Sequence, residues 1–164
     1  MNITLIGMAG AGKSTVGRVL AKRLGYDFVD IDAVLEAKHG RPLQELLDEA
    51  GDEAFLHMER EVALSYQNGL QNTVISTGGS MVYSPAAMEH LKKISKIVFL
   101  DASLDDIKKR ITVGGRGIVG GRDKPFEEVY AERLPLYKRY ADIVVPMSGS
   151  IEDNAEQVLL ALAD

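Results

Sequence analysis

Near the start of the sequence, residues 7–14 combine three glycines with a lysine and a serine in the pattern G-x-x-x-x-G-K-[ST]. Glycines at these positions let backbone N–H groups surround phosphate oxygens, and the lysine reaches the outer phosphates of a nucleotide. The serine hydroxyl is a suitable oxygen ligand for Mg²⁺. The pattern therefore predicts a phosphate-binding loop for a nucleoside triphosphate, formed by Gly10, Ala11, Gly12, Lys13, Ser14 and Thr15.

The segments on either side of this loop are the types that a phosphate site needs. Residues 3–6 are a short apolar run, typical of a buried strand. After the loop, apolar residues recur at helical spacing, at Val16, Val19, Leu20 and Leu24. Gly25 then ends the predicted helix. A strand, a glycine loop and a helix N-terminus together direct N–H groups and the positive end of a helix dipole at a bound anion.

Strand-like and helical segments alternate along the whole sequence. We predict strands at residues 3–6, 27–29, 73–76, 96–100 and 142–145. Helices are predicted after Lys13, over much of 32–70, and at 85–93, 104–111, 125–140 and 151–163. Pro85 and Pro125 are predicted to be the first residues of their helices, and Ser150 an N-cap. This alternation predicts an α/β fold of three layers, in which helices cover both faces of a five-stranded parallel sheet.

Composition narrows the possible classes of protein. A chain of 164 residues without an evident linker predicts one domain over residues 1–164. A net charge of −5 argues against a nucleic-acid-binding protein that works through a basic surface. The absence of cysteine excludes disulfides, thiolate zinc sites and a cysteine nucleophile. No signal peptide or apolar membrane span is evident, so we expect a soluble, cytoplasmic protein without membrane partners.

A glycine-rich segment at residues 112–124 interrupts the regular pattern. It holds five of the sixteen glycines and three basic residues, Arg116, Arg122 and Lys124. A loop of this length is usually functional or disordered. Beside a phosphate-binding loop, it predicts a lid that excludes water and brings a cation to the transferred phosphoryl group. The alternative is an ordinary surface loop.

Two acidic residues, Asp30 and Asp32, follow the second predicted strand directly. Ligands in open α/β sheets bind at the carboxyl ends of the strands, so these side chains are candidates for the active site. The alternative is that they are turn or N-cap residues. Leu43, Leu46 and Leu47, at helical spacing, are interpreted as core residues rather than a contact surface.

Four further motifs follow the phosphate loop in order, and together they resemble those of the shikimate kinases. The sequence Asp30-Ile31-Asp32 is similar to the D-x-D of this family, and Phe55 with Glu59 is similar to its F-R-x-x-E. Thr77-Gly78-Gly79 resembles its T-G-G-G turn, and residues 133–137 read R-L-P-L-Y, as in its R-x-P-L-Y. The resemblance covers nearly the whole chain. It implies a P-loop kinase fold with a lid at 112–124 and acceptor-binding helices within residues 32–62.

The resemblance also implies a phosphate donor site. The activity would be transfer of the γ-phosphate of ATP to shikimate, giving shikimate 3-phosphate, with ATP and Mg²⁺ as cofactors. Lys13 would neutralise charge on the transferred group, Ser14 would bind Mg²⁺, and Asp30 would hold the metal through water. Arg116 would be the catalytic arginine of the lid, and Arg110 would lie against adenine.

An acceptor site follows from the same resemblance. Asp32 would hold the acceptor hydroxyls and accept the proton from the attacking one. Backbone N–H groups of Gly78 and Gly79 would approach the substrate closely, because glycine has no side chain. Arg133 would bind the acceptor carboxylate with its guanidinium fork. A monomer is expected from the family, and the partner would be a small hydroxy acid rather than a macromolecule.

The sequence departs from the family pattern in the acceptor site. Leu56 stands where F-R-x-x-E has arginine, and Ser80 stands where T-G-G-G has its third glycine. Arg60 lies one helical turn after Leu56 and is a candidate replacement. Residues 116–119 read R-G-I-V where the family usually has R-P-L-L. These departures leave the phosphate-binding residues unchanged.

Two alternatives to a kinase of shikimate remain open from the sequence. One is a kinase of the same family that acts on a different small hydroxy acid or polyol. The other is a non-catalytic module that binds ATP and regulates a partner. Retention of Lys13, Ser14, Asp30, Asp32 and Arg133 together argues against the module. A nucleoside monophosphate or gluconate kinase fits less well, because the R-x-P-L-Y motif is present and no base-binding acceptor motif is recognisable.

Overall fold

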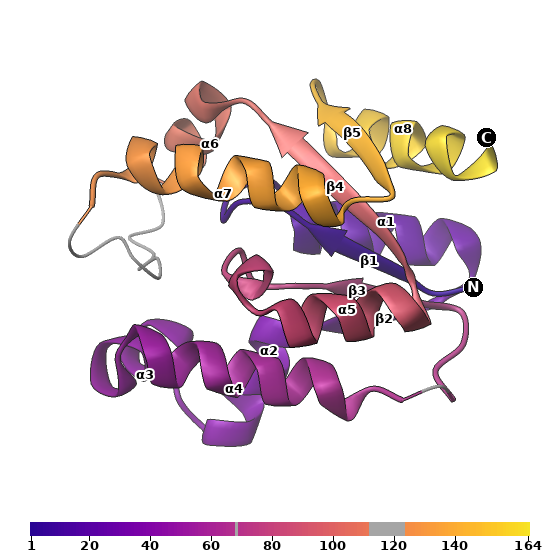
Figure 1. Ribbon diagram of the computed structural model, residues 1–164. Helices are drawn as coiled ribbons and strands as arrows, with labels where there is room; N and C mark the ends of the chain where they lie inside the picture. The colour runs from indigo at the N-terminus through magenta and orange to yellow at the C-terminus, as the bar shows by residue number, and fades with distance from the viewer. Residues whose placement is uncertain (68, 112–123) are drawn as a thin grey trace.

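Five parallel strands form the centre of the molecule, as the computed structural model shows for residues 1–67, 69–111 and 124–164 (Figure 1). They are β1 (Ile3–Ile6), β2 (Asp27–Asp30), β3 (Thr73–Ser76), β4 (Lys96–Ala102) and β5 (Ile143–Met147). Their order is β2-β3-β1-β4-β5, with every neighbouring pair parallel. The central strand β1 is buried along its whole length. The predicted strands agree with these bounds to within two residues at each end.

Helices cover both faces of the sheet and form the outer two layers. Helices α1 (Lys13–Leu24) and α8 (Ile151–Ala163) pack side by side on one face, while α5 (Pro85–Ile94) and α7 (Phe126–Tyr140) cover the other (Figure 1). Helix α6 (Leu104–Ile111) follows β4, and a short 3-10 helix, η1 (Met81–Tyr83), precedes α5. The predicted three-layer α/β fold with a five-stranded parallel sheet is therefore confirmed.

The region between β2 and β3 consists of three helices rather than one long segment. They are α2 (Ile31–His39), α3 (Leu43–Ala50) and α4 (Asp52–Ser65). Gly40 and Gly51 end the first two, both at positive φ, a backbone conformation that glycine adopts without steric cost. This helical group projects from one edge of the sheet, next to β2 and α5 (Figure 1).

Two of the three helix starts predicted from the sequence agree with the structure. Ser84 caps α5, and Ser150 forms a capping box with Asp153 at the start of α8. The prediction that Pro125 is the first residue of its helix was wrong by one position. Pro125 is the N-cap residue, because its ψ of 151° is extended and its carbonyl already accepts from the N–H of Val129.

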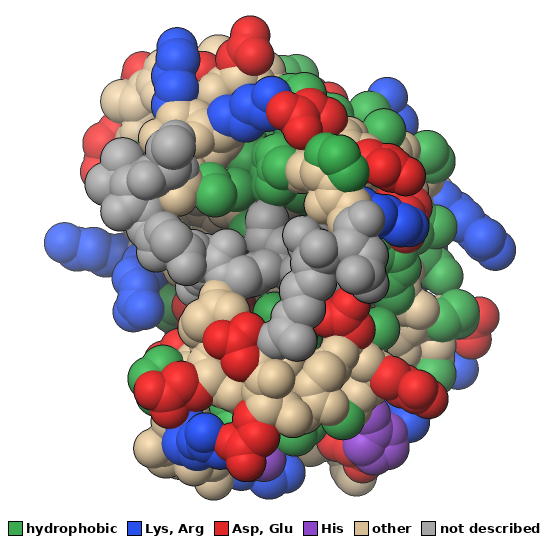
Figure 2. Space-filling model, turned by 90° about the vertical axis from the view of Figure 1, so that its left-hand side faces the viewer, with side chains coloured by type: hydrophobic (Ala, Val, Ile, Leu, Met, Phe, Trp, Pro, Cys, Tyr) green, Lys and Arg blue, Asp and Glu red, His purple; other side chains and the backbone are tan. Residues whose placement is uncertain are grey.

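The carboxyl ends of the strands lie together at one side of the molecule, where sheets of this type bind ligands (Figure 1). Figure 2 looks at this side, on which acidic and basic side chains of the described residues are interspersed. In residues 1–67, 69–111 and 124–164, no helix combines the length and the apolar character needed to cross a membrane. The predicted lid at 112–124 falls outside the described residues, except for Lys124.

Candidate active site

The loop between β1 and α1 has the backbone geometry of an anion-binding site. Gly10 and Gly12 adopt φ angles of 84° and 90°, a left-handed region that residues with side chains rarely occupy. Gly12 is the N-cap residue of α1, and no side chain of the described residues caps the helix there. The first turn of α1 also lacks acidic residues. Its N–H groups and the positive end of its dipole are therefore directed at the site where a phosphate would bind.

The Lys13 side chain folds back over this loop. Its Nζ donates to the carbonyl oxygens of Gly7, at 2.7 Å, and Met8, at 2.8 Å. The side chain is largely buried, so water screens its positive charge less than it would at the surface. From this position the ammonium group can neutralise a neighbouring phosphate.

Ser14 and Asp30 come together from α1 and the end of β2. Ser14 Oγ donates to Asp30 Oδ2 at 2.7 Å, while Asp30 Oδ1 accepts from the backbone N–H of Asp32 at 3.0 Å. Asp30 is thus the N-cap of α2, and its second oxygen faces the phosphate loop. A hydroxyl and a carboxylate oxygen beside bound phosphates are the donor set that Mg²⁺ prefers, since it usually binds one or two protein oxygens plus phosphates and water. These residues fit the ion.

Asp32 and Glu59 present their carboxyl groups to the same glycine. A Cβ added to Gly78 would lie 2.9 Å from Asp32 Oδ1 and 3.2 Å from Glu59 Oε2. Any side chain at position 78 would therefore push the two carboxyl groups apart. Glycine at this position keeps an acidic residue of α2 and one of α4 close together at the end of β3.

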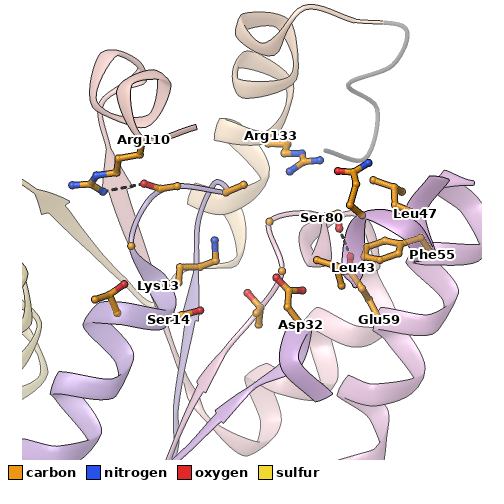
Figure 3. Close-up of a pocket in the computed structure, with 18 residues that line it drawn as sticks. Lys13, Ser14, Asp32, Leu43, Leu47, Phe55, Glu59, Ser80, Arg110 and Arg133 are labelled. Carbon is orange, nitrogen blue, oxygen red and sulfur yellow. Dashed lines mark hydrogen bonds between the residues drawn. The ribbon is translucent and has the colours of Figure 1, made fainter. Parts of the chain in front are cut away.

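Glu59 occupies an unusual environment for a charged residue. Its residue surface is 1% exposed, and Ser80 Oγ donates to its Oε1 in a short hydrogen bond (Figure 3). Its Oε2 is buried with no hydrogen-bond partner among the residues that the structure describes. Burial raises the pKa of Glu59 to about 8, although the Ser80 hydrogen bond and the charges of Arg133 and Lys13 lower it. The carboxyl group is therefore mostly protonated at pH 7.

Arg133 approaches the cavity from α7 and is held from several sides. Its Nε donates to Tyr83 Oη at 3.2 Å, and its guanidinium lies over the Tyr83 ring at 5.1 Å from the centroid. A Cβ on Gly79 would lie 3.0 Å from Arg133 Nη1. The residue is 1% exposed, so its charge acts in a site from which water is largely excluded. A buried guanidinium of this kind suits a carboxylate ligand.

One cavity of about 270 Å³ joins the phosphate loop to these acceptor-side residues (Figure 3). Of the predicted donor residues, its lining includes Gly10, Gly12, Lys13, Ser14, Thr15 and Arg110. Of the predicted acceptor residues, it includes Asp32, Gly78, Gly79 and Arg133. Ala11 is buried within the loop, Asp30 lies behind Ser14, and Arg116 is outside the described residues. Arg110 Nη1 donates to the carbonyl oxygen of Gly10 at 2.9 Å, which places its guanidinium over the loop.

Several cavity residues were absent from the predicted site. They are Ala9 of the phosphate loop, Leu43, Gln44 and Leu47 of α3, Phe55 and Glu59 of α4, Thr77 and Ser80. Leu46 and Leu47 are buried as expected, but Leu43 and Leu47 also face the cavity. Helical spacing of leucines cannot distinguish a core from an apolar cavity wall. For Phe55 and Glu59 the family motif was an available signal.

Arg60, the candidate replacement for the arginine that the family pattern has at position 56, lies away from the cavity. Arg60 is hydrogen-bonded to the ring of His57 and lies 4.0 Å from a carboxylate oxygen of Glu61. Its side chain is 40% exposed and does not line the cavity. Leu56 packs against the hydrophobic core instead of the acceptor side. Within the described residues, α4 thus supplies no arginine to the cavity.

Comparison with known proteins agrees with this geometry. A family model described as shikimate kinase matches residues 9–163, almost the entire chain. The chain belongs to the shikimate kinase family. Its members are ATP-dependent phosphotransferases that act on a small molecule.

Individual shikimate kinases match over nearly their full length. The enzyme of Francisella tularensis subsp. novicida is 38% identical over an alignment of 156 residues, which covers 93% of this chain and 89% of that protein. The structure of shikimate kinase from Acinetobacter baumannii in complex with shikimate aligns with a TM-score of 0.89 at 28% identity, covering 99% and 92% of the two chains. Shikimate kinase from Aquifex aeolicus aligns with a TM-score of 0.83 at 29% identity, covering 99% and 96%.

Proposed function

We propose that the protein transfers the γ-phosphoryl group of ATP to a hydroxyl group of shikimate, forming shikimate 3-phosphate. The observation that carries this proposal is the single cavity that joins the phosphate loop to Asp32 and Arg133. Transfer between two substrates requires that both lie in one enclosed site, with the reacting oxygen close to the transferred phosphorus. The Acinetobacter relative, whose structure contains shikimate, supports the choice of acceptor.

On the donor side, the chain positions and neutralises the phosphates. Lys13 balances the charge that develops on the transferred phosphoryl group, and N–H groups at the start of α1 bind the neighbouring oxygens. Ser14 and Asp30 would hold Mg²⁺, which would neutralise charge at the phosphates when bound. Arg110 would lie against adenine, and Arg116, the expected cation of the lid, belongs to the residues that the structure does not describe.

On the acceptor side, the chain orients a hydroxyl and a carboxylate. Arg133 binds the carboxylate of shikimate through its guanidinium fork. Asp32 accepts hydrogen bonds from the ring hydroxyls and takes the proton of the attacking one, and backbone N–H groups of Gly78 and Gly79 contact the ring substituents. Phosphoryl transfer depends mainly on positioning and charge, so a weak base such as Asp32 is sufficient.

One observation favours a second candidate, a kinase of another small hydroxy acid or polyol. Because position 56 carries leucine, α4 supplies no cation to the cavity among the described residues, and Arg133 is the guanidinium proposed to bind an acceptor carboxylate. A charged hydrogen bond contributes about 1.5–3 kcal/mol. An acceptor whose binding depends less on a carboxylate would lose less binding free energy from having leucine rather than arginine at position 56.

The experiment that separates the two candidates measures ADP formation with a panel of acceptors. The purified protein is supplied with ATP and Mg²⁺, and with shikimate, sugar acids, other hydroxy acids or amino-alcohols. The proposed function requires turnover with shikimate that saturates at micromolar to low-millimolar concentrations. Saturable turnover on another alcohol, with none on shikimate, would establish the second candidate. ATP binding without turnover on any acceptor would instead support a regulatory module.

A further inference from the structure

Ser80 and Glu59 form a buried hydrogen-bonded pair in the wall of the cavity, and the mechanism above does not use it. Ser80 lies in the turn between β3 and η1, while Glu59 projects from α4. Both residues are buried, and both line the cavity (Figure 3). Ser80 Oγ donates to Oε1 of Glu59, which leaves Oε2 beside Gly78 and Asp32.

Among the described residues, helix α4 itself provides no cation that holds the Glu59 carboxyl group. Position 56 lies three residues before Glu59, a spacing at which helical side chains meet, but it carries leucine. Arg60 is engaged with His57 and Glu61. The Ser80 hydroxyl is therefore the hydrogen-bond donor to Glu59 in the part of the chain that the structure describes.

We propose that Ser80 is a positioning residue of the acceptor site, whose hydroxyl fixes one oxygen of Glu59 so that the other faces the acceptor. This inference rests on the proposed function, because it assumes that the acceptor occupies the space beside Asp32 and Arg133. Without the hydroxyl, the Glu59 side chain has no fixed partner and loses its preferred orientation. The acceptor must then order the Glu59 side chain when it binds. This ordering cost weakens acceptor binding more than it slows the transfer step.

The charge of Glu59 gives this role a second, independent readout. The groups that act on its carboxyl are the Ser80 hydroxyl, the Asp32 carboxylate of α2, the Arg133 guanidinium of α7 and the Lys13 ammonium of α1. Burial raises the pKa of Glu59, and Ser80 lowers it by donating to the ionised form. Removal of the hydroxyl should therefore raise this pKa further, even when no substrate is bound.

The experiment compares Ser80→Ala with the unmodified protein in two measurements. The first follows the carboxyl carbon of Glu59 by NMR during a pH titration of the protein without ligands. The second measures kcat and KM for shikimate at pH values below and above 8. Ser80→Thr, which keeps a hydroxyl, is the rescue variant. Ser95→Ala is the matched control, because it removes a partly buried hydroxyl that bonds Thr4 and Leu91 far from the cavity.

For Ser80→Ala we expect a higher titration midpoint for Glu59 and a KM for shikimate raised about threefold to tenfold, with a smaller change in kcat. Ser80→Thr should restore the midpoint and the KM, and Ser95→Ala should leave both unchanged. An unchanged midpoint and KM in Ser80→Ala, with only lower stability, would overturn the proposal. If the unmodified protein does not phosphorylate shikimate, the proposed function fails, and the titration alone then decides whether Ser80 holds Glu59.

Discussion

Three carboxyl groups lie near the cavity, and their different contacts suit them to different tasks. Asp30 accepts hydrogen bonds from Ser14 and from the start of α2, so both of its oxygens are engaged. Glu59 is deeply buried, with one of its oxygens bonded to Ser80. Asp32 presents its carboxyl group to Gly78, as Glu59 does. Such differences in environment allow one site to combine a metal-binding carboxylate, a base and a neutral acid.

The raised pKa of Glu59 leads to a prediction about stability. A glutamate carboxyl group in the unfolded chain has an ordinary pKa of 4.5, whereas in the folded protein the pKa of Glu59 is about 8. Between these values the folded protein retains a proton that the unfolded chain releases, so the free energy of unfolding falls as pH rises through this window. Glu59→Gln removes this contribution, which is on the order of a few kcal/mol. Urea unfolding should show that the free energy of unfolding decreases less from pH 5 to pH 9 in Glu59→Gln than in the unmodified protein. Equal decreases in the two proteins would contradict the raised pKa of Glu59.

A second prediction concerns the missing cation of α4. Leu56→Arg places a guanidinium at the (i, i+3) position before Glu59, from which the longer arginine side chain can extend past the core contact of Leu56 towards the acceptor side. It should lower the pKa of Glu59 and strengthen binding of an acidic acceptor, reducing the KM for shikimate by up to about tenfold. Leu56→Met is the control, because it preserves apolar volume without adding charge. An equal KM in both variants would show that position 56 does not reach the acceptor.

At the scale of elements, α7 connects the acceptor site to the core of the sheet. Tyr137 Oη donates to the carbonyl oxygen of Gly79 at 2.6 Å, and its ring stacks on Phe99 of β4 at 5.1 Å between centroids. One turn earlier, Arg133 contacts Tyr83 of η1. Helix α7 therefore contacts both the turn after β3 and η1, and it carries Arg133, the proposed acceptor arginine.

Tyr137→Phe tests this connection, because it removes the hydroxyl and keeps the ring. The free energy of unfolding should fall by about 1–2 kcal/mol through loss of a buried hydrogen bond. The KM for shikimate should also rise, since the Gly79 turn is no longer tied to α7. Chemical denaturation and steady-state kinetics measure the two effects. A stability loss without any change in KM would mean that the turn holds its position independently of α7.

The sequence predicted elements more successfully than the walls of the cavity. The strands and the phosphate loop depend on local patterns: an apolar run, a glycine at positive φ, a helix after Lys13. The division of residues 32–70 into three helices was not predicted, although Gly40 and Gly51 mark the breaks. Leu43 and Leu47 face the cavity because of how α3 packs against α4, and hydrophobic spacing carries no information about that packing.

At the scale of the whole molecule, the parallel sheet brings together residues that are distant in the sequence. The carboxyl ends of β1, β2 and β3 supply the phosphate loop, Asp30 and the Gly78 turn, and α6 and α7 add Arg110 and Arg133. The order β2-β3-β1 places these three strand ends side by side. The proposed donor and acceptor sites therefore both depend on the carboxyl ends of these neighbouring strands.

The expectation of a monomer belongs to the same scale and stays a prediction. Sedimentation velocity should give the mass of one chain at assay concentrations. Activity per chain should also be independent of protein concentration, whereas activity that rises with concentration would indicate an obligate oligomer.

The most direct test of the account is to follow phosphorylated product and ADP together by ³¹P NMR, with ATP, Mg²⁺ and shikimate. We expect one equivalent of shikimate 3-phosphate for each ADP. Lys13→Ala should lower kcat by about 100- to 1,000-fold, and Asp32→Asn should lower it by about 100-fold. ADP that forms at the same rate without shikimate, or turnover that both variants retain, would contradict a phosphoryl transfer catalysed in this cavity.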